Sequence, residues 1–166
     1  ILADLHRAPL EKFAMPALSS VAATCRQVAT DRANTWAHLY EPYRSEVQYG
    51  LDLLAAFADP AAMPAPAVAL HGDLNPGNIL LDAPTAGPAR WLAIAYPDPA
   101  AVLIPRINLA HQMLGVPPQR ICQWACARTV ESVLWRLQTW QDPAQQQHNL
   151  RELPAVRTWA RLAQQY

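Results

Sequence analysis

Residues 68–81 read VALHGDLNPGNILL, a polar loop between two short apolar runs. The loop places His71, Asp73, Asn75 and Asn78 within eight residues of each other. A carboxylate such as that of Asp73 can orient a substrate hydroxyl and accept its proton. An amide oxygen such as that of Asn78 is a hard ligand suited to Mg²⁺. Together they form half of a phosphoryl-transfer site, whose work is mainly positioning and charge neutralisation.

The same loop also admits a purely structural interpretation. In that interpretation His71 and Asp73 cap or brace a tight turn, and the two asparagines make turn hydrogen bonds. Spacing alone does not decide between a catalytic loop and a braced turn, and both interpretations stay open at this point.

Working outward, the flanking sequence predicts the fold. The apolar runs at 68–70, 79–81 and 91–94 are typical of short strands, and they predict a small β hairpin with the polar loop at its mouth. Apolar residues at helical spacing predict helices on both sides of this region. Before the loop, helices are expected over 17–40 and from Ser45 to Phe57, the second with a capping box of Ser45 and Gln48. After the loop, one helix is expected over 106–114, and two more are expected to begin near Pro118 and near Pro154. The predicted fold class is mainly α with a small β hairpin.

Composition limits the class of protein. The 166 residues suit a single domain, with a helical part at 1–66, the loop and hairpin at 67–104, and C-terminal helices at 105–166. The formal net charge is zero, which argues against nucleic acid as a partner. Charges or prolines interrupt every apolar run, so no membrane partner is expected. The absence of a signal peptide and the odd number of cysteines favour a cytoplasmic protein.

Two further groups of residues have alternative interpretations. Cys122 and Cys126 lie one helical turn apart, where they fit either two small core residues or a shared metal ion. Arg157 and Arg161 have the same spacing, which suits either a grip on an anionic group or a solvated helix face.

The string LHGDLNPGNILL at 70–81 resembles the catalytic loop H-G-D-x-x-x-x-N of aminoglycoside and related small-molecule kinases. The opening ILADLHRAPL is similar to the helix that follows the hinge between the two lobes of these kinases. WLAI at 91–94 and RICQWACARTVESVLW at 120–135 resemble the streptomycin and hydroxyurea phosphotransferase branch. The resemblance covers most of the chain, and the loop motif is its most specific part.

The resemblance implies the C-terminal lobe of the protein-kinase-like fold. It implies ATP-dependent transfer of phosphate to the hydroxyl group of a small molecule, such as an aminoglycoside or a hydroxyurea-like antibiotic. His71 would then brace the loop, Asp73 would act as the base, and Asn78 would bind the Mg²⁺ that accompanies ATP.

The chain departs from the family pattern at the second metal ligand. Where the family has W-L-A-I-D-P, this sequence has Ala95, and a methyl group cannot coordinate a metal ion. Asp98, three residues further on, is the candidate to replace the lost ligand. Asn108 likewise stands where the family often has an aspartate. These departures favour an alternative in which the chain is a pseudokinase-type binding module.

The nucleotide-binding lobe is a second point of departure. The chain contains no G-x-G-x-x-G or Walker-type sequence, and its single lysine, Lys12, lies between prolines. We therefore expect a C-lobe fragment that is inactive alone and whose partner is a missing N-terminal lobe or a second copy of the chain. An unrelated helical interaction domain, with a loop that matches by chance, is the remaining alternative.

Overall fold

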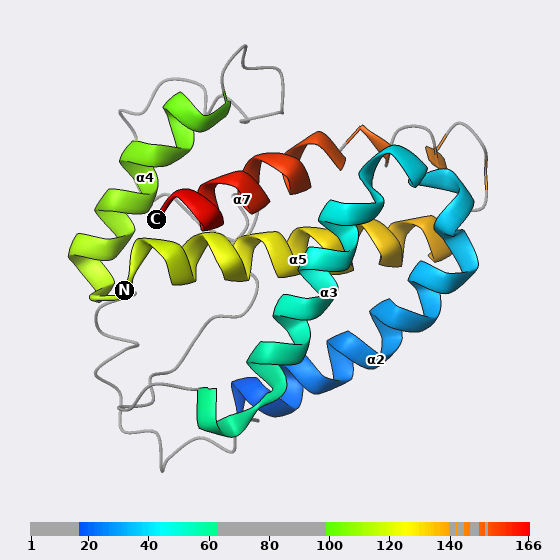
Figure 1. The fold of residues 1–166 in the computed structure, drawn as a ribbon, viewed down its shortest axis with the longest axis horizontal. Coiled ribbons are helices and arrows are strands. Elements are labelled where there is room, and N and C mark those ends of the chain that lie inside the picture. The colour runs from blue at the N-terminus through cyan, green and yellow to red at the C-terminus, as the bar shows by residue number, and fades with distance from the viewer. Residues whose placement is uncertain (1–16, 63–98, 140–141, 143–144, 147–149, 152) are drawn as a thin grey trace, which may run out of the picture.

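The computed structural model describes residues 17–62, 99–139 and 153–166, together with 142, 145–146 and 150–151. In these ranges the chain forms α-helices and short 3₁₀ turns (Figure 1). The α-helices are α2 (Leu18–Trp36), α3 (Arg44–Ala58), α4 (Pro99–Leu114), α5 (Pro118–Thr139) and α7 (Leu153–Gln165). The 3₁₀ turns are η2 (Ala37–Leu39), η3 (Glu41–Tyr43) and η4 (Pro60–Ala62).

Helix α5 is the central element of the described bundle. It contacts α2, α3, α4 and α7. Figure 1 shows α3 crossing α5, with α2 and α7 on either side of it. The turns η2 and η3 reverse the chain between α2 and α3, so these two helices pack against each other as a hairpin. Each helix buries one face against its neighbours, as amphipathic helices of a globular domain do.

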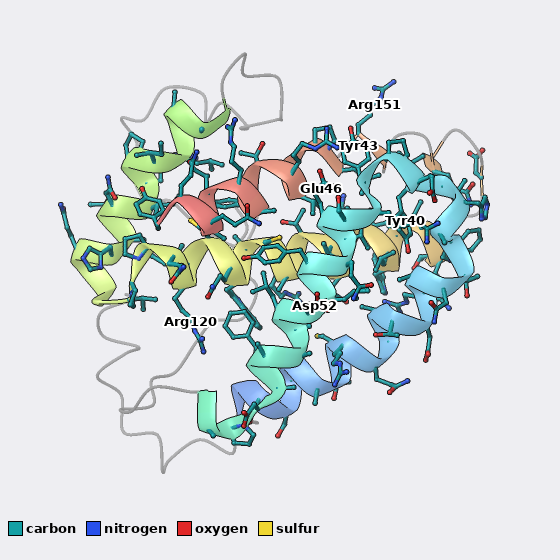
Figure 2. The ribbon with its side chains drawn as sticks, viewed as in Figure 1. Tyr40, Tyr43, Glu46, Asp52, Arg120 and Arg151 are labelled. Atoms are coloured by element: carbon teal, nitrogen blue, oxygen red, sulfur yellow. The ribbon has the colours of Figure 1, made fainter. Side chains whose placement is uncertain are left out.

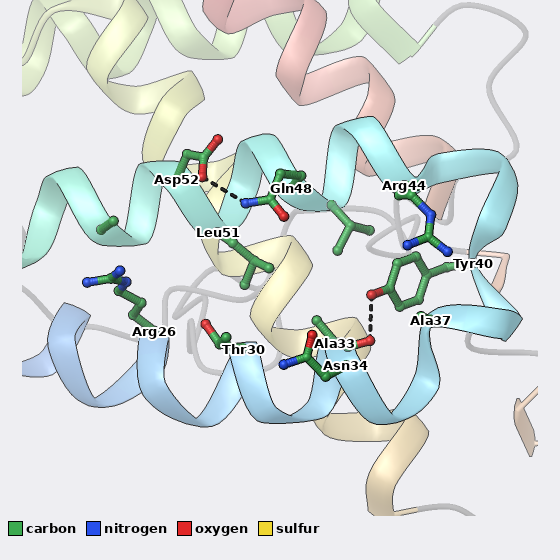
Figure 3. A pocket seen from close by; sticks show the side chains of 12 residues that line it. Arg26, Thr30, Ala33, Asn34, Ala37, Tyr40, Arg44, Gln48, Leu51 and Asp52 are labelled. Carbon is green, nitrogen blue, oxygen red and sulfur yellow. Dashed lines mark hydrogen bonds between the residues drawn. The ribbon is translucent and has the colours of Figure 1, made fainter.

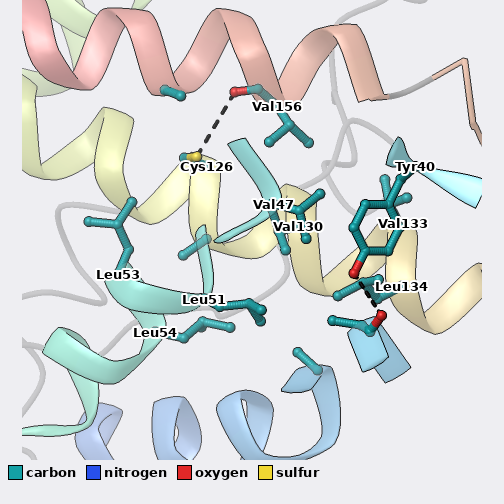
Figure 4. Packing of buried hydrophobic residues seen from close by; sticks show 14 of the residues in the cluster. Tyr40, Val47, Leu51, Leu53, Leu54, Cys126, Val130, Val133, Leu134 and Val156 are labelled. Atoms are coloured by element: carbon teal, nitrogen blue, oxygen red, sulfur yellow. Dashed lines mark hydrogen bonds between the residues drawn. The ribbon is translucent and has the colours of Figure 1, made fainter. Parts of the chain in front are cut away.

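The main core lies between α2, α3, α5 and α7 (Figure 4). Its largest fully buried side chains are Phe57, Leu54, Leu134, Leu137, Leu153, Val130, Val133 and Val156. Full burial of each such side chain contributes about 1.5–3 kcal/mol relative to exposure. This cluster therefore supplies most of the energy that holds the hairpin against the two C-terminal helices.

A smaller cluster attaches α4 to α5 and α7. It consists of Ala100, Ile107, Cys122, Leu162 and Ala163. Because it contains few large side chains, α4 is held less strongly than the four helices of the main core.

The structure confirms the core interpretation of Cys122 and Cys126. Both side chains are completely buried, and they lie in different clusters. Burial raises the pKa of Cys126 to about 12, so its thiol is protonated at neutral pH. The Cys126 sulfur lies 4.0 Å from the carbonyl oxygen of Val156, and this contact joins α5 to α7 (Figure 4).

The predicted fold class, mainly α with a small β hairpin, is corrected to all-α. The described residues form helices, turns and a bend, and no strand. Apolar helix faces cover one another in both clusters, so the core closes without a sheet. Residues 68–94, to which the hairpin was assigned, lie outside the described ranges.

Helix α4 begins earlier than the sequence predicted. A helix was expected over 106–114, after Pro105, but α4 starts at Pro99 and contains Pro105. Pro99 occupies the first helical position, where a missing N–H is tolerated. An internal proline removes one helical hydrogen bond, but burial of Ala100 and Ile107 holds the helix on both sides of it.

The start of α3 also differs from the prediction. Ser45 and Gln48 do not form a capping box, because Tyr43 is the N-cap and makes no side-chain capping bond. Both predicted capping side chains bond instead to acidic side chains of the same helix, at 2.9 Å each. The backbone N–H of Arg44 donates to the preceding turn η3, so the backbone caps α3 at this end.

Candidate functional site

The predicted catalytic residues fall in one segment of the chain. His71, Asp73, Asn78 and Asp98, as well as the departure at Ala95, all lie within residues 63–98, outside the described residues. The structure describes the elements on either side, η4 up to Ala62 and α4 from Pro99. The roles assigned to these residues therefore stay predictions.

A groove lies between α2 and α3 on the described surface (Figure 3). Its volume is about 230 Å³. The floor consists of small and aliphatic side chains, and the rim is polar. The lining residues are Arg26, Thr30, Ala33, Asn34, Ala37, Tyr40, Arg44, Val47, Gln48, Leu51, Asp52 and Ala55.

A buried hydrogen bond lies at one end of this groove. The Tyr40 hydroxyl donates a 2.7 Å hydrogen bond to the carbonyl oxygen of Ala33 (Figure 3). Burial raises the pKa of Tyr40, so this donor keeps its proton at neutral pH. On the rim, Gln48 donates to Asp52 at 2.9 Å. The groove thus offers amide, carboxylate and guanidinium groups above an apolar floor, and it can hold a small polar molecule.

An arginine of α7 joins the last helix to the start of α3. The Arg157 guanidinium donates to Glu46 at 2.5 Å and to the carbonyl oxygen of Pro42 at 3.0 Å. It also lies over the ring of Tyr43, 4.6 Å from the ring centroid. Figure 2 shows Tyr43 and Glu46 where α3 approaches α7. The Arg157 side chain is 56% exposed, so it lies on the solvated face of α7 and also pairs there with Glu46.

The same contact fixes the charge of Glu46. Partial burial alone would raise its pKa, but hydrogen bonds from Arg157, from the backbone and from Ser45 lower it overall. Glu46 is accordingly ionised at neutral pH and paired with Arg157. The sequence offered no signal for this pairing, because the two residues lie 111 positions apart.

A second arginine has an unusual environment near the start of α5. The guanidinium carbon of Arg120 lies 4.3 Å from the centroid of the Phe57 ring. Burial lowers the pKa of Arg120. Phe57 in turn contacts Trp124 edge-on, with ring centroids 5.1 Å apart. This stack ties the start of α5 to the end of α3. Figure 2 shows Arg120 near the start of α5.

The described residues supply no ready metal centre. No group of three or more histidine, cysteine, aspartate or glutamate side chains gathers within the described ranges. The Mg²⁺ ligands predicted from the sequence lie in residues 63–98, where the donor set fits the family pattern only in part. Asn78 supplies an amide oxygen, whereas Ala95 has no donor atom.

The described residues of the chain form an all-α bundle, and the sequence contains the kinase-type motif H-G-D-x-x-x-x-N. Comparison with known protein families identifies the family to which the chain belongs. The sequence profile described as the phosphotransferase enzyme family matches residues 1–94, just over half of the 166 residues. The chain belongs to the phosphotransferase enzyme family. No curated protein sequence and no solved structure gives a significant match.

The matched range has a clear relation to the structure. It includes α2, α3 and the loop at 71–78, and it ends at Ile94, one residue before Ala95. Helices α4, α5 and α7 lie beyond it. The match concerns the family as a whole, so the streptomycin and hydroxyurea branch stays a prediction.

Proposed function

We propose that this chain carries the catalytic segment of an ATP-dependent phosphotransferase that acts on the hydroxyl group of a small molecule. The observation that supports the proposal is the family match, which includes the whole motif from His71 to Asn78. Asp73 accepts the proton of the acceptor hydroxyl while the hydroxyl oxygen attacks the γ-phosphorus of ATP. The bond from that phosphorus to the bridging oxygen breaks, ADP leaves, and His71 braces the loop. The acceptor is an aminoglycoside or a hydroxyurea-like antibiotic.

Members of this family generally use ATP and Mg²⁺. In this chain the Asn78 amide oxygen is the residue to hold the ion, which when bound neutralises charge on the transferring phosphoryl group. Ala95 leaves the site with one ligand fewer than the family pattern. We therefore propose that the chain alone does not complete transfer, that Asp98 does not restore the lost ligand, and that a nucleotide-binding lobe is its partner.

The chain is proposed to work in the cytoplasm. Cys25, Cys122 and Cys126 are free thiols, which suits a reducing compartment. Within the described part of the chain, no helix is both long and apolar enough to cross a membrane.

Restoring the metal ligand tests the role of Ala95. We expect Ala95→Asp to increase Mg²⁺-dependent ATP affinity at least about tenfold, because a carboxylate neutralises far more charge than a methyl group. Calorimetric titration with ATP, with and without Mg²⁺, measures this. Ala89→Asp is the matched control, with the same charge change outside the motif. Equal affinities for Ala95→Asp and Ala89→Asp would contradict the assignment of position 95.

The role of Asp73 is tested in the restored chain combined with a nucleotide-binding lobe, because we propose that the chain alone does not complete transfer. In the Ala95→Asp background, Asp73→Asn should lower phosphate transfer at least about hundredfold while ATP affinity stays unchanged, because it removes the base and keeps the shape. Release of labelled phosphate from ATP to hydroxylated acceptors and to water is the measurement. Asp82→Asn, nine residues along the chain and outside the motif, is the control. Unchanged transfer in Asp73→Asn would exclude Asp73 as the base.

Ala95 also favours a second candidate function, a pseudokinase-type module that binds a small molecule without phosphate transfer. In that case Ala95→Asp would gain Mg²⁺-dependent ATP affinity, and transfer would still be absent for every acceptor. The two candidate functions are thus separated by the same pair of variants.

A further inference from the structure

The second arginine of α7 differs from the first in its surroundings. Arg157 is held by Glu46 and by the backbone of Pro42. Arg161, one turn further along, makes no hydrogen bond or ion pair to any residue in the described ranges. It lines a shallow hollow of about 260 Å³ between α3 and α7. Both arginines lie on the exposed face of α7, and the anion-binding interpretation remains open for Arg161.

The polar groups around this hollow are mainly hydrogen-bond donors. Its lining consists of Ser45, Glu46, Tyr49, Arg157, Ala160, Arg161 and Gln164. The Tyr49 hydroxyl makes no hydrogen bond within the described part of the chain. Burial raises the pKa of Tyr49, so the phenol stays protonated and can donate. The Gln164 amide adds two N–H donors, and Arg161 adds a planar fork of N–H groups.

The charge balance of the hollow favours an anion. Glu46 is its acidic residue, and Arg157 already neutralises that carboxylate, which also accepts from Ser45 at 2.9 Å. The positive charge of Arg161 is left without a counter-charge among the described residues. An anion placed at Arg161 therefore meets a net attraction, which the nearby Glu46–Arg157 pair changes little.

We propose that this hollow is a binding site for a phosphate group, with Arg161 as its ionic partner and Tyr49 and Gln164 as further donors. A guanidinium fork binds carboxylate and phosphate alike. The number of donors favours phosphate, because Arg161, Tyr49 and Gln164 together can serve more than the two oxygens of a carboxylate. This proposal is independent of the phosphotransferase activity, since it uses none of the residues assigned to transfer.

The test is a titration of the chain with inorganic phosphate at constant ionic strength, followed by the amide NMR signals of α3 and α7. We expect saturable binding with a dissociation constant on the order of 1 mM, and shifts that concentrate near Tyr49 and Arg161. Arg161→Gln should weaken binding about tenfold, and Tyr49→Phe about threefold. Arg151→Gln removes an exposed arginine that lines neither hollow, and it should leave the affinity within about twofold.

The same titration decides against the proposal if Arg161→Gln and Arg151→Gln weaken binding equally, or if acetate binds as tightly as phosphate. Unsaturable shifts spread over the whole surface would also overturn it. A simple phosphate monoester identifies the source of the ligand. If it binds more tightly than inorganic phosphate, the site serves phosphorylated small molecules. If it binds more weakly, the site serves free phosphate.

Discussion

Phe57→Ala should lower the free energy of unfolding by about 3–5 kcal/mol, the usual cost of removing a buried aromatic side chain. The Phe57 side chain is 2% exposed, at the end of α3. It contacts the Trp124 ring at right angles and carries the Arg120 guanidinium over its face. The substitution therefore leaves a cavity, removes an aromatic pair and exposes a partly buried cation at once.

Urea unfolding followed by circular dichroism measures this loss. Phe57→Leu keeps most of the side-chain volume and should lower the free energy of unfolding by only about 1–1.5 kcal/mol. This variant still gives a measurable loss of stability if Phe57→Ala does not fold. Leu109→Ala is the control, because that side chain is 55% exposed, and its effect should stay within about 0.5 kcal/mol. A cost of Phe57→Ala equal to that of Leu109→Ala would contradict the packing of α3 on α5.

Gly50→Val should destabilise the protein by about 3 kcal/mol, although valine is the better helix former. A Cβ atom on Gly50 would lie 2.5 Å from a methyl carbon of Val130 and 2.9 Å from its Cβ. Val130 is buried in α5 and is stiff at its first side-chain dihedral angle, so it cannot turn away. Gly50 thus permits the close approach of α3 and α5.

A double-mutant cycle tests this contact. Val130→Ala removes the two methyl groups that meet the new side chain, so we expect it to recover at least about 1 kcal/mol in the Gly50→Val background. Ala56→Val, at an exposed position of the same helix, is the matched control and should cost about 0.5 kcal/mol. Strict additivity of Gly50→Val and Val130→Ala would show that the two residues do not touch.

Much of the helical framework was predictable from local patterns. The periodicity over 17–40 indicated α2, and prolines marked the starts of α5 and α7 to within one residue. Apolar spacing also identified Val133, Leu134 and Leu137 as buried residues. These predictions succeed because helix formation and amphipathic burial depend on neighbours three and four positions apart.

Other features needed information from distant parts of the chain. The capping box at Ser45 failed because the turn η3 meets the helix first, and the start of α4 failed because packing holds a helix through Pro105. The mixed fold class was wrong for the described residues, since short apolar runs do not by themselves show whether a strand forms. The candidate site at 71–78 rests on sequence alone, and its residues stay predictions.

The sequence by itself determined the family, through a local motif whose residue types and spacing carry the chemistry. It also determined where most helices lie, because their signals are local. Only the tertiary structure decided that Gly50 must remain small, that Arg157 pairs with Glu46, and that Arg161 faces a hollow without a partner among the described residues. Each of these depends on atoms brought together from helices far apart in the chain, and no spacing along the sequence records such contacts.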